Sequence, residues 1–448
     1  MAGDVKIKDR RETLGTVEGD LTLENAAVLS DSSDNTVTVT GTTRCRGECT
    51  FNCNLKTSSL EGDDADILAE NLVADRWIRI KRGRLRVDGS CSAESAEVEN
   101  SISIEEDLTC GKVRVGGSLD VGGLTKSGDI DVGGSLHTEG GIETDNMNVG
   151  GSAEVGGDTD SERIEVGGKL LVKGALKAVR IEVGGSLEGK SIVNLSRIDV
   201  GGRASIAGGS IDDRIEVGGL FESSGNLKFN RMDVGGVSKI GGGDGKEIEV
   251  GGTFTSSGDL VFERIEVGGT VKIKGNGSGK SIEVGGTLDC TGDLDLSEDL
   301  EIGGKANVAG RLKVRNAEVG GILQALEISA EEGIEVSKLR TRKGARARVI
   351  ELPDKGEAKG PLIAQEITIG EKCHVEDLYG GEIELRRNSR ARNIQARTIE
   401  IESGCSVSGF IKYTDDIEID EDVKLGQKPE RVKNLPDPGD IDLREDVQ

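Results

Sequence analysis

The chain has 448 residues, of which 68 are glycine and 5 are proline, and its formal net charge at pH 7 is −25. An acidic body of this kind is not expected to bind nucleic acid, and no apolar run approaches the roughly 18 residues of a membrane-spanning helix. The glycines do not recur at every third position and proline is scarce, which excludes collagen and disfavours a Pro/Gly-rich disordered chain.

Residues 1–54 already contain a repeating strand signal. Apolar pairs separated by one residue occur at Val5/Ile7, Leu21/Leu23 and Val37/Val39, and an alternation of period two predicts half-buried strands. We therefore predict the first β-solenoid turns here. The start, Met1-Ala2-Gly3-Asp4-Val5-Lys6-Ile7, has no secretory apolar region, so we expect the protein to stay in the cytoplasm, either free or at a membrane surface.

Three of the eight cysteines form the spacing Cys45-x3-Cys49-x3-Cys53. Scattered thiols at strand-like positions are typical of small core residues in a reducing compartment. The alternative is a metal site, because alternate residues of a strand share a face. No zinc-finger spacing and no histidine accompany these cysteines, so we expect core packing.

The strand register fails between residues 55 and 74, where we predict an irregular loop or a distorted turn. Solenoid turns resume over residues 75–114, with the pair Ile78/Ile80. Trp77 stands three residues before Ile80, where later turns place arginine. It is either an anchor for a partner or a side chain packed under the irregular segment.

Residues 115–321 carry the most regular signal, a residue followed by Gly-Gly at intervals of about seventeen residues. The steps are seventeen except for one of sixteen and one of eighteen. The residues before Gly-Gly are Val115, Val132, Val149, Val166, Val183, Val200, Val217, Val234, Val250, Val267, Val284, Ile302 and Val319. A repeat this short cannot bury an apolar face alone, so neighbouring turns must supply its core.

Each turn contains three short apolar–polar alternations, which predicts an all-β, single-stranded parallel β-helix. We expect a triangular β-solenoid of about 17 residues per turn, right-handed because parallel β crossovers favour that hand. Gly184-Gly185 would turn the chain at a corner, where glycine tolerates positive φ. Over roughly two dozen turns the coil would reach about 110 Å.

The predicted core positions compensate one another in volume. Four and six residues after the valine, Ala204/Ile206 is followed by Phe221/Ser223, as close packing in a narrow prism requires. Leu227/Phe229 and Leu260/Phe262 would fill a third side. The turns between them carry Gly-rich segments at 241–245 and 275–279, which we predict to be loops, so the repeat here is a pair of turns.

Two rows of charge are predicted on the outer face. The acids are Glu165, Glu182, Asp199, Glu216, Asp233, Glu249, Glu266, Glu283, Glu301 and Glu318. Two residues before some of them stand Arg163, Arg180, Arg197, Arg214, Arg231 and Arg264. Stacked acids repel, and the arginines can offset that repulsion as a surface network. A Ca²⁺-binding ladder is the alternative.

Residues 322–425 continue the solenoid with a basic face, and residues 426–448, which contain three of the five prolines, are predicted to be a disordered tail. Between Lys338 and Arg397 the balance of charge turns positive. The residues that we single out there as a candidate partner surface, together with Trp77, are Arg340, Arg342, Arg346, Arg348, Arg386, Arg387, Arg390 and Arg392. This face is either simply solvated or a docking surface for an acidic partner, namely a neighbouring coil or an anionic membrane.

Catalytic motifs are scarce. The two histidines, His137 and His374, are expected to point outward, and neither has a nucleophile at a recognisable spacing. Residues 184–191 (GGSLEGKS) match the letters of a phosphate-binding Gly-x4-Gly-Lys-Ser loop, but their Gly-Gly pair is predicted to lie at a coil corner with no helix behind it. No nucleophile elbow occurs. We therefore expect no enzyme activity, cofactor or small-molecule substrate.

These residues together resemble the bactofilins, which are polymer-forming cytoskeletal proteins. The resemblance is clearest from Val200-Gly201-Gly202 to Arg231-Met232-Asp233-Val234 and from Ile383-Glu384-Leu385 to Ile399-Glu400-Ile401. It implies a right-handed triangular β-helix that polymerises end to end without nucleotide. This chain is several times longer than a typical bactofilin and lacks the short apolar segment that some members use on membranes.

Three classes of function remain open from the sequence. The first is a self-assembling scaffold, because open ends of a β-solenoid template further pairing. The second is a hexapeptide-repeat acyltransferase, suggested by the six-residue steps from Val115 to Val121 and from Val149 to Val155. The third is a cell-surface or adhesive rod, which would require export.

Overall fold

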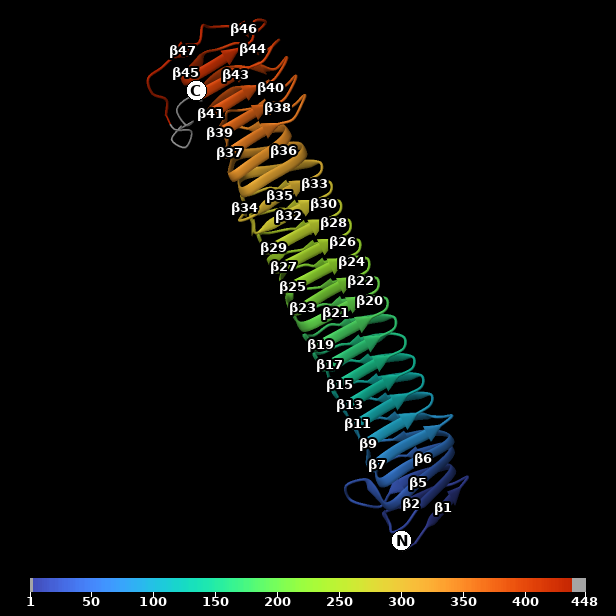
Figure 1. Cartoon of the computed structure of the whole chain (residues 1–448). Helices are drawn as coiled ribbons and strands as arrows, with labels where there is room; N and C mark the ends of the chain where they lie inside the picture. Colours follow the sequence, from blue (N-terminus) through green and yellow to red (C-terminus); the bar gives the residue numbers. More distant parts are fainter. Residues whose placement is uncertain (1–2, 437–448) are drawn as a thin grey trace. The chain divides into compact units, whose positions relative to one another are not determined.

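The computed structural model describes residues 3–436, which form a parallel β-solenoid of about 25 turns with about 17 residues per turn. These residues contain strands and no helix, so the predicted fold class is confirmed. The chain divides into two compact units, unit 1 (Met1–Ser224) and unit 2 (Gly225–Gln448). Within each unit the strands stack in successive turns (Figure 1).

The described part of unit 1, residues 3–224, contains twenty-four strands, of which the first ten are less regular in length. These are β1 (Val5–Lys8), β2 (Arg11–Leu14), β3 (Thr16–Val17), β4 (Leu21–Ser30), β5 (Thr36–Phe51), β6 (Asn54–Ala69), β7 (Leu72–Lys81), β8 (Arg84–Val87), β9 (Cys91–Val98) and β10 (Ser101–Ile104). From β11 onward short and long strands alternate. They are β11 (Leu108–Val115), β12 (Ser118–Val121), β13 (Thr125–Val132), β14 (Ser135–Thr138), β15 (Ile142–Val149), β16 (Ala153–Val155), β17 (Thr159–Val166), β18 (Lys169–Val172), β19 (Leu176–Val183), β20 (Ser186–Gly189), β21 (Val193–Val200), β22 (Arg203–Ile206), β23 (Gly209–Val217) and β24 (Leu220–Ser223).

Unit 2 contains the remaining strands of the described residues. Its first part holds β25 (Asn226–Val234), β26 (Val237–Ile240), β27 (Gly242–Val250), β28 (Thr253–Ser256), β29 (Leu260–Val267), β30 (Thr270–Ile273), β31 (Gly277–Gly279), β32 (Ser281–Val284), β33 (Thr287–Cys290), β34 (Leu294–Leu296), β35 (Asp299–Ile302) and β36 (Lys305–Thr341). Its second part holds β37 (Ala345–Leu352), β38 (Glu357–Lys359), β39 (Leu362–Ile369), β40 (His374–Val375), β41 (Asp377–Leu385), β42 (Arg390–Ala391), β43 (Asn393–Ile401), β44 (Ser406–Val407), β45 (Ile411–Ile419), β46 (Lys424–Leu425) and β47 (Glu430–Arg431).

One turn has three sides, each with its own inward pair. In β21, Val193 and Leu195 point inward, two outward residues follow where the strand bends, and Ile198 and Val200 then point inward. We call the side ending in the residue before Gly-Gly the first side, the short strand after it the second side, and the start of the long strand the third side. The three alternations predicted for each turn are therefore present.

The parallel register places equivalent residues of successive turns above one another. Ile181 of β19 pairs with Ile198 of β21, and Val183 pairs with Val200. All four side chains are buried. The core is thus a set of aliphatic columns, and each turn completes the core of the turns beside it.

The Gly-Gly corners require glycine, but not for the positive φ that was expected from the sequence. Neither Gly184 nor Gly185 has a positive φ; instead, a Cβ built on Gly184 would lie 2.4 Å from the carbonyl oxygen of Gly167 one turn earlier. The amide of Gly184 also donates to the carbonyl of Val166 at 2.9 Å, so the hydrogen-bonded ladder continues through the corner. Close stacking of backbones, rather than a special dihedral angle, excludes a side chain here.

Volume compensation on the second side is confirmed. Ala204 pairs with Phe221 and Ile206 pairs with Ser223 in the register of β22 and β24. All four are buried. A large side chain therefore lies against a small one in the next turn.

The third side of unit 2 alternates over two turns, as predicted, but without the predicted loops. Gly245 lies in register between Phe229 and Phe262, and a Cβ on Gly245 would come within 2.2 Å of the Phe229 ring. In the next pair, a Cβ on Gly279 would lie 2.3 Å from the Phe262 ring. The Gly-rich segments belong to β27 and β31, because their missing side chains make room for the phenylalanines.

Two predicted irregularities are strands in part. Residues 55–74, predicted as an irregular loop or a distorted turn, lie mostly in β6 and β7, which pair in parallel with a shift of register between Thr57 and Leu60, so the segment is a distorted turn and not a loop. Part of the predicted tail is attached, because β47 pairs with β45 through Lys412↔Glu430 and Tyr413↔Arg431. The rest of that prediction, residues 437–448, lies outside the described residues.

Candidate functional site

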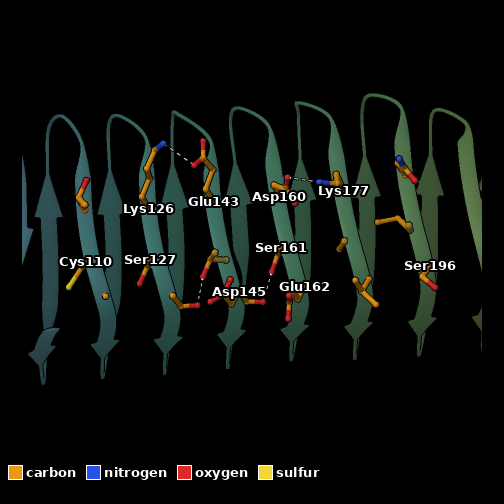
Figure 2. A pocket seen from close by; sticks show the side chains of 18 of the residues that line it. Cys110, Lys126, Ser127, Glu143, Asp145, Asp160, Ser161, Glu162, Lys177 and Ser196 are labelled. Atoms are coloured by element: carbon orange, nitrogen blue, oxygen red, sulfur yellow. Dashed lines mark hydrogen bonds and ion pairs between the residues drawn. The ribbon is translucent and has the colours of Figure 1, made fainter. Parts of the chain in front are cut away.

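A surface groove in unit 1 follows the bend between the third and first sides. It has a volume of about 920 Å³ and extends from Thr109 to Asp212. Figure 2 shows its side chains in two rows that cross successive strands. One row holds Lys126, Glu143, Asp160 and Lys177, and the other holds Cys110, Ser127, Asp145, Ser161, Glu162 and Ser196.

The inward residues beneath this groove are small, and their hydroxyls are hydrogen-bonded to the backbone. The Thr144 hydroxyl donates to the carbonyls of Gly128 and Asn146 at 3.0 and 3.1 Å. The Ser161 hydroxyl donates to Asp145 and Arg163 carbonyls at 3.2 and 3.1 Å. These bonds satisfy carbonyls at the bend and turn the hydroxyls away from solvent.

The rims of the groove carry both paired and unpaired charges. Lys126 Nζ lies 2.9 Å from Glu143, and Lys177 Nζ lies 2.8 Å from Asp160. Asp145 and Glu162, on successive turns, are exposed and make no ion pair with any residue of the described chain. The groove is therefore acidic, and the carboxylates of Asp145 and Glu162 are available to a cationic ligand.

The sequence analysis missed this groove, although a signal for it exists. When the chain is written in rows of one turn, the position seventeen apart reads Cys110, Ser127, Thr144, Ser161 and Ala178. A column of small residues inside a strand marks a place where the chain bends inward. The charge rows on the outer face were predicted from the sequence, whereas this inward column of small residues was not.

The predicted charge rows exist, and they differ between the units. In unit 1 Arg163, Arg180 and Arg197 stack in register. Arg163 contacts Glu182 at 3.3 Å, and Arg214 contacts Glu216 at 3.5 Å. The acids of this row are therefore offset by guanidinium groups.

In unit 2 the row of acids continues into turns that have no arginine two residues before the acid. Arg264 lies 3.2 Å from both Glu266 and Glu283. Beyond it a hollow of about 380 Å³ is lined by acids, among them Asp299, Glu301, Glu318, Glu335 and Glu351. Apart from Asp299, which pairs with Arg315 at 3.0 Å, these acids form no ion pair within residues 3–436.

The structure does not bring the predicted basic residues together on one face. Arg340 and Arg390 lie on the second side, in β36 and β42, whereas Arg346 and Arg348 lie on the third side and its bend in β37. The remaining members, Arg342, Arg386, Arg387 and Arg392, lie in the connections after β36, β41 and β42.

Several of these arginines already have carboxylate partners. Arg386 Nε lies 2.7 Å from Glu384, and Arg387 Nε lies 3.5 Å from Glu402. Arg392 forms a bidentate pair with Asp377, whose hydrogen bond raises the pKa of the guanidinium. The set is therefore dispersed and partly neutralised, which argues against a single positive patch.

Trp77 occupies the column in which later turns place arginine, as predicted. It pairs with Ser95 in the register of β7 and β9 and is half-buried. The guanidinium of Arg79 lies over its ring, 5.3 Å from the centroid. A cation–π contact of this kind holds the ring against the surface.

The cysteine cluster is buried. Cys45, Cys49 and Cys53 are free thiols with at most 4% exposure. The neighbouring Cys49 thiol and burial raise the pKa of Cys45, and burial raises the pKa of Cys53 to about 11. Across residues 3–436 no group of three or more His, Cys, Asp or Glu is arranged to hold a metal ion.

The histidines lie at outward positions. His137 of β14 pairs in register with Glu154 of β16, and His374 of β40 is exposed. No helix within residues 3–436 is long and apolar enough to cross a membrane.

The two terminal turns differ in how well their cores are covered. In the first turn Ile7, Leu14 and Val17 are at most 1% exposed. In the last, Ile417 and Ile419 of β45 take the inward positions that stack on Ile399 and Ile401, yet both are only half-buried. The pairing of β47 reaches Lys412 and Tyr413 of β45, so Asp416–Ile419 pairs on one side only within the described chain.

Comparison with known proteins adds one match. A family model described as repeats of unknown function (DUF5649) matches residues 2–48. Neither the curated proteins nor the solved structures give a match to this chain. Together with the solenoid, the matched repeats fit a repeat β-helix protein.

Proposed function

We propose that this chain is a structural protein that assembles with further copies of itself through the terminal turns of its β-solenoid, in the manner of the bactofilins. The assembly serves as a cytoskeletal scaffold in the cytoplasm, either free or against a membrane surface. It needs no nucleotide, cofactor or small-molecule substrate, and the chain is not an enzyme. Other scaffold proteins are further partners of the same surface.

The observation that carries this proposal is the state of β45. Ile399 and Ile401 are each 1% exposed because Ile417 and Ile419 cover them from the next turn. Among residues 3–436, no side chain covers Ile417 and Ile419 in the same way, and Asp416–Ile419 has a ladder partner on one side only. A further turn from a second copy would bury the isoleucines and extend the ladder, as exposed strand edges do.

Electron microscopy of negatively stained, purified protein tests the proposal. We expect filaments or closed assemblies for the natural chain, and short or single particles for the double variant Ile417→Lys/Ile419→Lys. The matched control is Val261→Lys, because Val261 of β29 is 52% exposed on a lateral side. Natural protein that stays monomeric in sedimentation at high concentration would overturn the proposal.

Location is tested separately. Fractionation of native cells should place the protein inside, either in the soluble fraction or with membranes. Recovery only from outside the cell would favour the adhesive class instead.

A further inference from the structure

The bend between the third and first sides is hollowed in both units, with different surroundings. In unit 1 it forms the 920 Å³ groove described above. In unit 2 a hollow of about 360 Å³ lies along the same bend, where Gln365, Gly380 and Arg397 form one wall. The other wall of that hollow is formed by Lys433, Asn434, Leu435 and Pro436 of the same chain.

An extended segment of this chain therefore already lies along this bend in unit 2. The hydrogen bonds near the segment are few: Val432 N donates to the Tyr413 carbonyl at 2.8 Å, and the Arg431 guanidinium donates to the Thr414 and Asp415 carbonyls at 2.9 and 3.2 Å. The strand it forms, β47, has two residues, and Lys433 and Asn434 are exposed. A contact of this size is weak, and such a segment can exchange between partners.

The charge of the segment fits the groove of unit 1. Residues 428–436 contain the cations Lys428, Arg431 and Lys433 and one acid, Glu430. The hollow that they line in unit 2 presents one cation, Arg397, and one acid, Asp415, so it carries no net negative charge to hold them. The groove of unit 1 presents the free carboxylates of Asp145 and Glu162, together with three further acids and two lysines.

The shapes also agree. The floor of the groove consists of small residues, such as Ser127 and Ala178, so a backbone can approach it closely. In unit 2 the equivalent place near the segment is Gly380. An extended peptide lying along the groove would cross successive turns about 4.8 Å apart and meet the carboxylates of Asp145 and Glu162 on two neighbouring turns.

We propose that the groove of unit 1 binds an extended segment, residues 428–436, of a second copy of this chain. The contact joins copies through their sides, so it goes beyond assembly through terminal turns and does not depend on it. Charge complementarity sets the specificity and the rate of association. Binding of the segment to the groove is predicted to weaken with salt, because the charged groups of both partners are exposed to solvent.

Fluorescence anisotropy with a labelled peptide of residues 426–436 tests the assignment on the full chain. We expect saturable binding that weakens with salt and that falls at least about tenfold in Asp145→Lys/Glu162→Lys, since two attractions become repulsions. The matched control is Asp120→Lys on the exposed second side, which should bind as the natural chain does. Equal binding to the groove variant, or no saturable binding, would overturn the proposal.

Two further arms separate the possible outcomes. A peptide of scrambled order that binds as tightly would show that the groove takes any basic peptide and not this segment. The variant Ile417→Lys/Ile419→Lys should keep full binding, so loss of terminal assembly and loss of groove binding are read independently. In the full chain, Ser196→Cys and Asn434→Cys in separate copies should cross-link on mixing, and Asp120→Cys with Asn434→Cys should not.

Discussion

Units 1 and 2 share the Gly-Gly corner but differ in the core residues of the third side and in the charged residues of the outer face. In unit 1 each regular turn is equivalent to the next, and its acid row is offset by stacked arginines such as Arg180 and Arg197. In the middle of unit 2 the third side repeats only every second turn, through Phe229 and Gly245, and the acid row beyond Glu283 loses its arginines. The corner therefore specifies the solenoid, while the third side and the outer rows are free to diverge.

The two-turn repeat of unit 2 is tested most strongly by removing a phenylalanine. Phe229→Ala should lower the local stability of β25–β29 by about 3–5 kcal/mol, because the ring leaves a cavity. Adding Gly245→Leu should recover about half of this loss, since a Cβ at position 245 points into the space of the ring. Hydrogen exchange of residues 226–267 measures both. Additive effects would contradict the alternation, because coupled neighbours should not add.

The shared corner gives the next largest effect. Gly184→Ala in unit 1 and Gly268→Ala in unit 2 should each cost about 1–3 kcal/mol, because the new methyl group overlaps a carbonyl oxygen of the preceding turn. Gly189→Ala is the matched control: its Cβ would meet Val193 Cγ1 at 3.4 Å, an ordinary contact, so it should be neutral or mildly stabilising. Urea midpoints followed by circular dichroism give the comparison. Equal losses at positions 184 and 189 would rule out the close-stacking explanation.

Acid should weaken both units through carboxylates held below their ordinary pKa. The Thr42 amide and Arg44 lower the pKa of Asp20 in unit 1, and the Arg311 amide and guanidinium lower that of Asp293 in unit 2. A depressed folded-state pKa gives stability that is present above the ordinary value of 3.8 and is lost as pH falls through the folded value. Both groups are partly exposed to solvent, so each should contribute less than about 1 kcal/mol.

Unfolding by urea at pH values from 6 to about 2 measures this loss. Asp20→Asn and Asp293→Asn should each flatten the profile of their own unit. A profile that is unchanged in both variants would show that these carboxylates carry no pH-dependent stability.

The smallest effect concerns the acid rows, and its sign should differ between the units. Glu318→Gln should stabilise unit 2 by roughly 0.5 kcal/mol, because it removes a carboxylate stacked on Glu301 without breaking an ion pair. Glu182→Gln should destabilise unit 1 by a similar amount, because Arg163 and Arg180 lose a partner. High salt should reduce both differences. The same sign in both units would mean that the arginine row does not compensate the acids.

The fold could be predicted from the sequence because each inward pair recurs about every seventeen residues. Val183 and Val200 are seventeen residues apart, which predicts that they stack in one column, and the register of β19 and β21 confirms it. The reason for the Gly-Gly corners could not be predicted, because a positive φ and a close approach of two backbones both select glycine. At 55–74 the sequence left a loop and a distorted turn open, because a register shift between Thr57 and Leu60 breaks the period without ending the strands.

The surfaces were harder to predict than the core. Arg386 and Arg390 are close in sequence, but the chain turns a corner between them, so nearness along the chain does not give a shared face. The groove depends on where the long strand bends, which the outward charges do not reveal. Residues seventeen apart, and not neighbours in sequence, are the proper basis for predicting a surface in this protein.

The stacking of one glycine corner on the next makes the turn an indivisible increment of length. Removing or duplicating a whole turn between Gly133 and Gly321 leaves each remaining corner glycine over another glycine and changes the stack by about 4.8 Å. A shift that moves another residue into the corner would instead bring its Cβ against a carbonyl oxygen, with overlaps like the 2.4 Å approach at Gly184. The sixteen- and eighteen-residue steps avoid this overlap, because Gly251 still stacks on Gly235 and Gly303 on Gly285. The contour of one turn can therefore vary by a residue, whereas the length of the stack along its axis changes by whole turns.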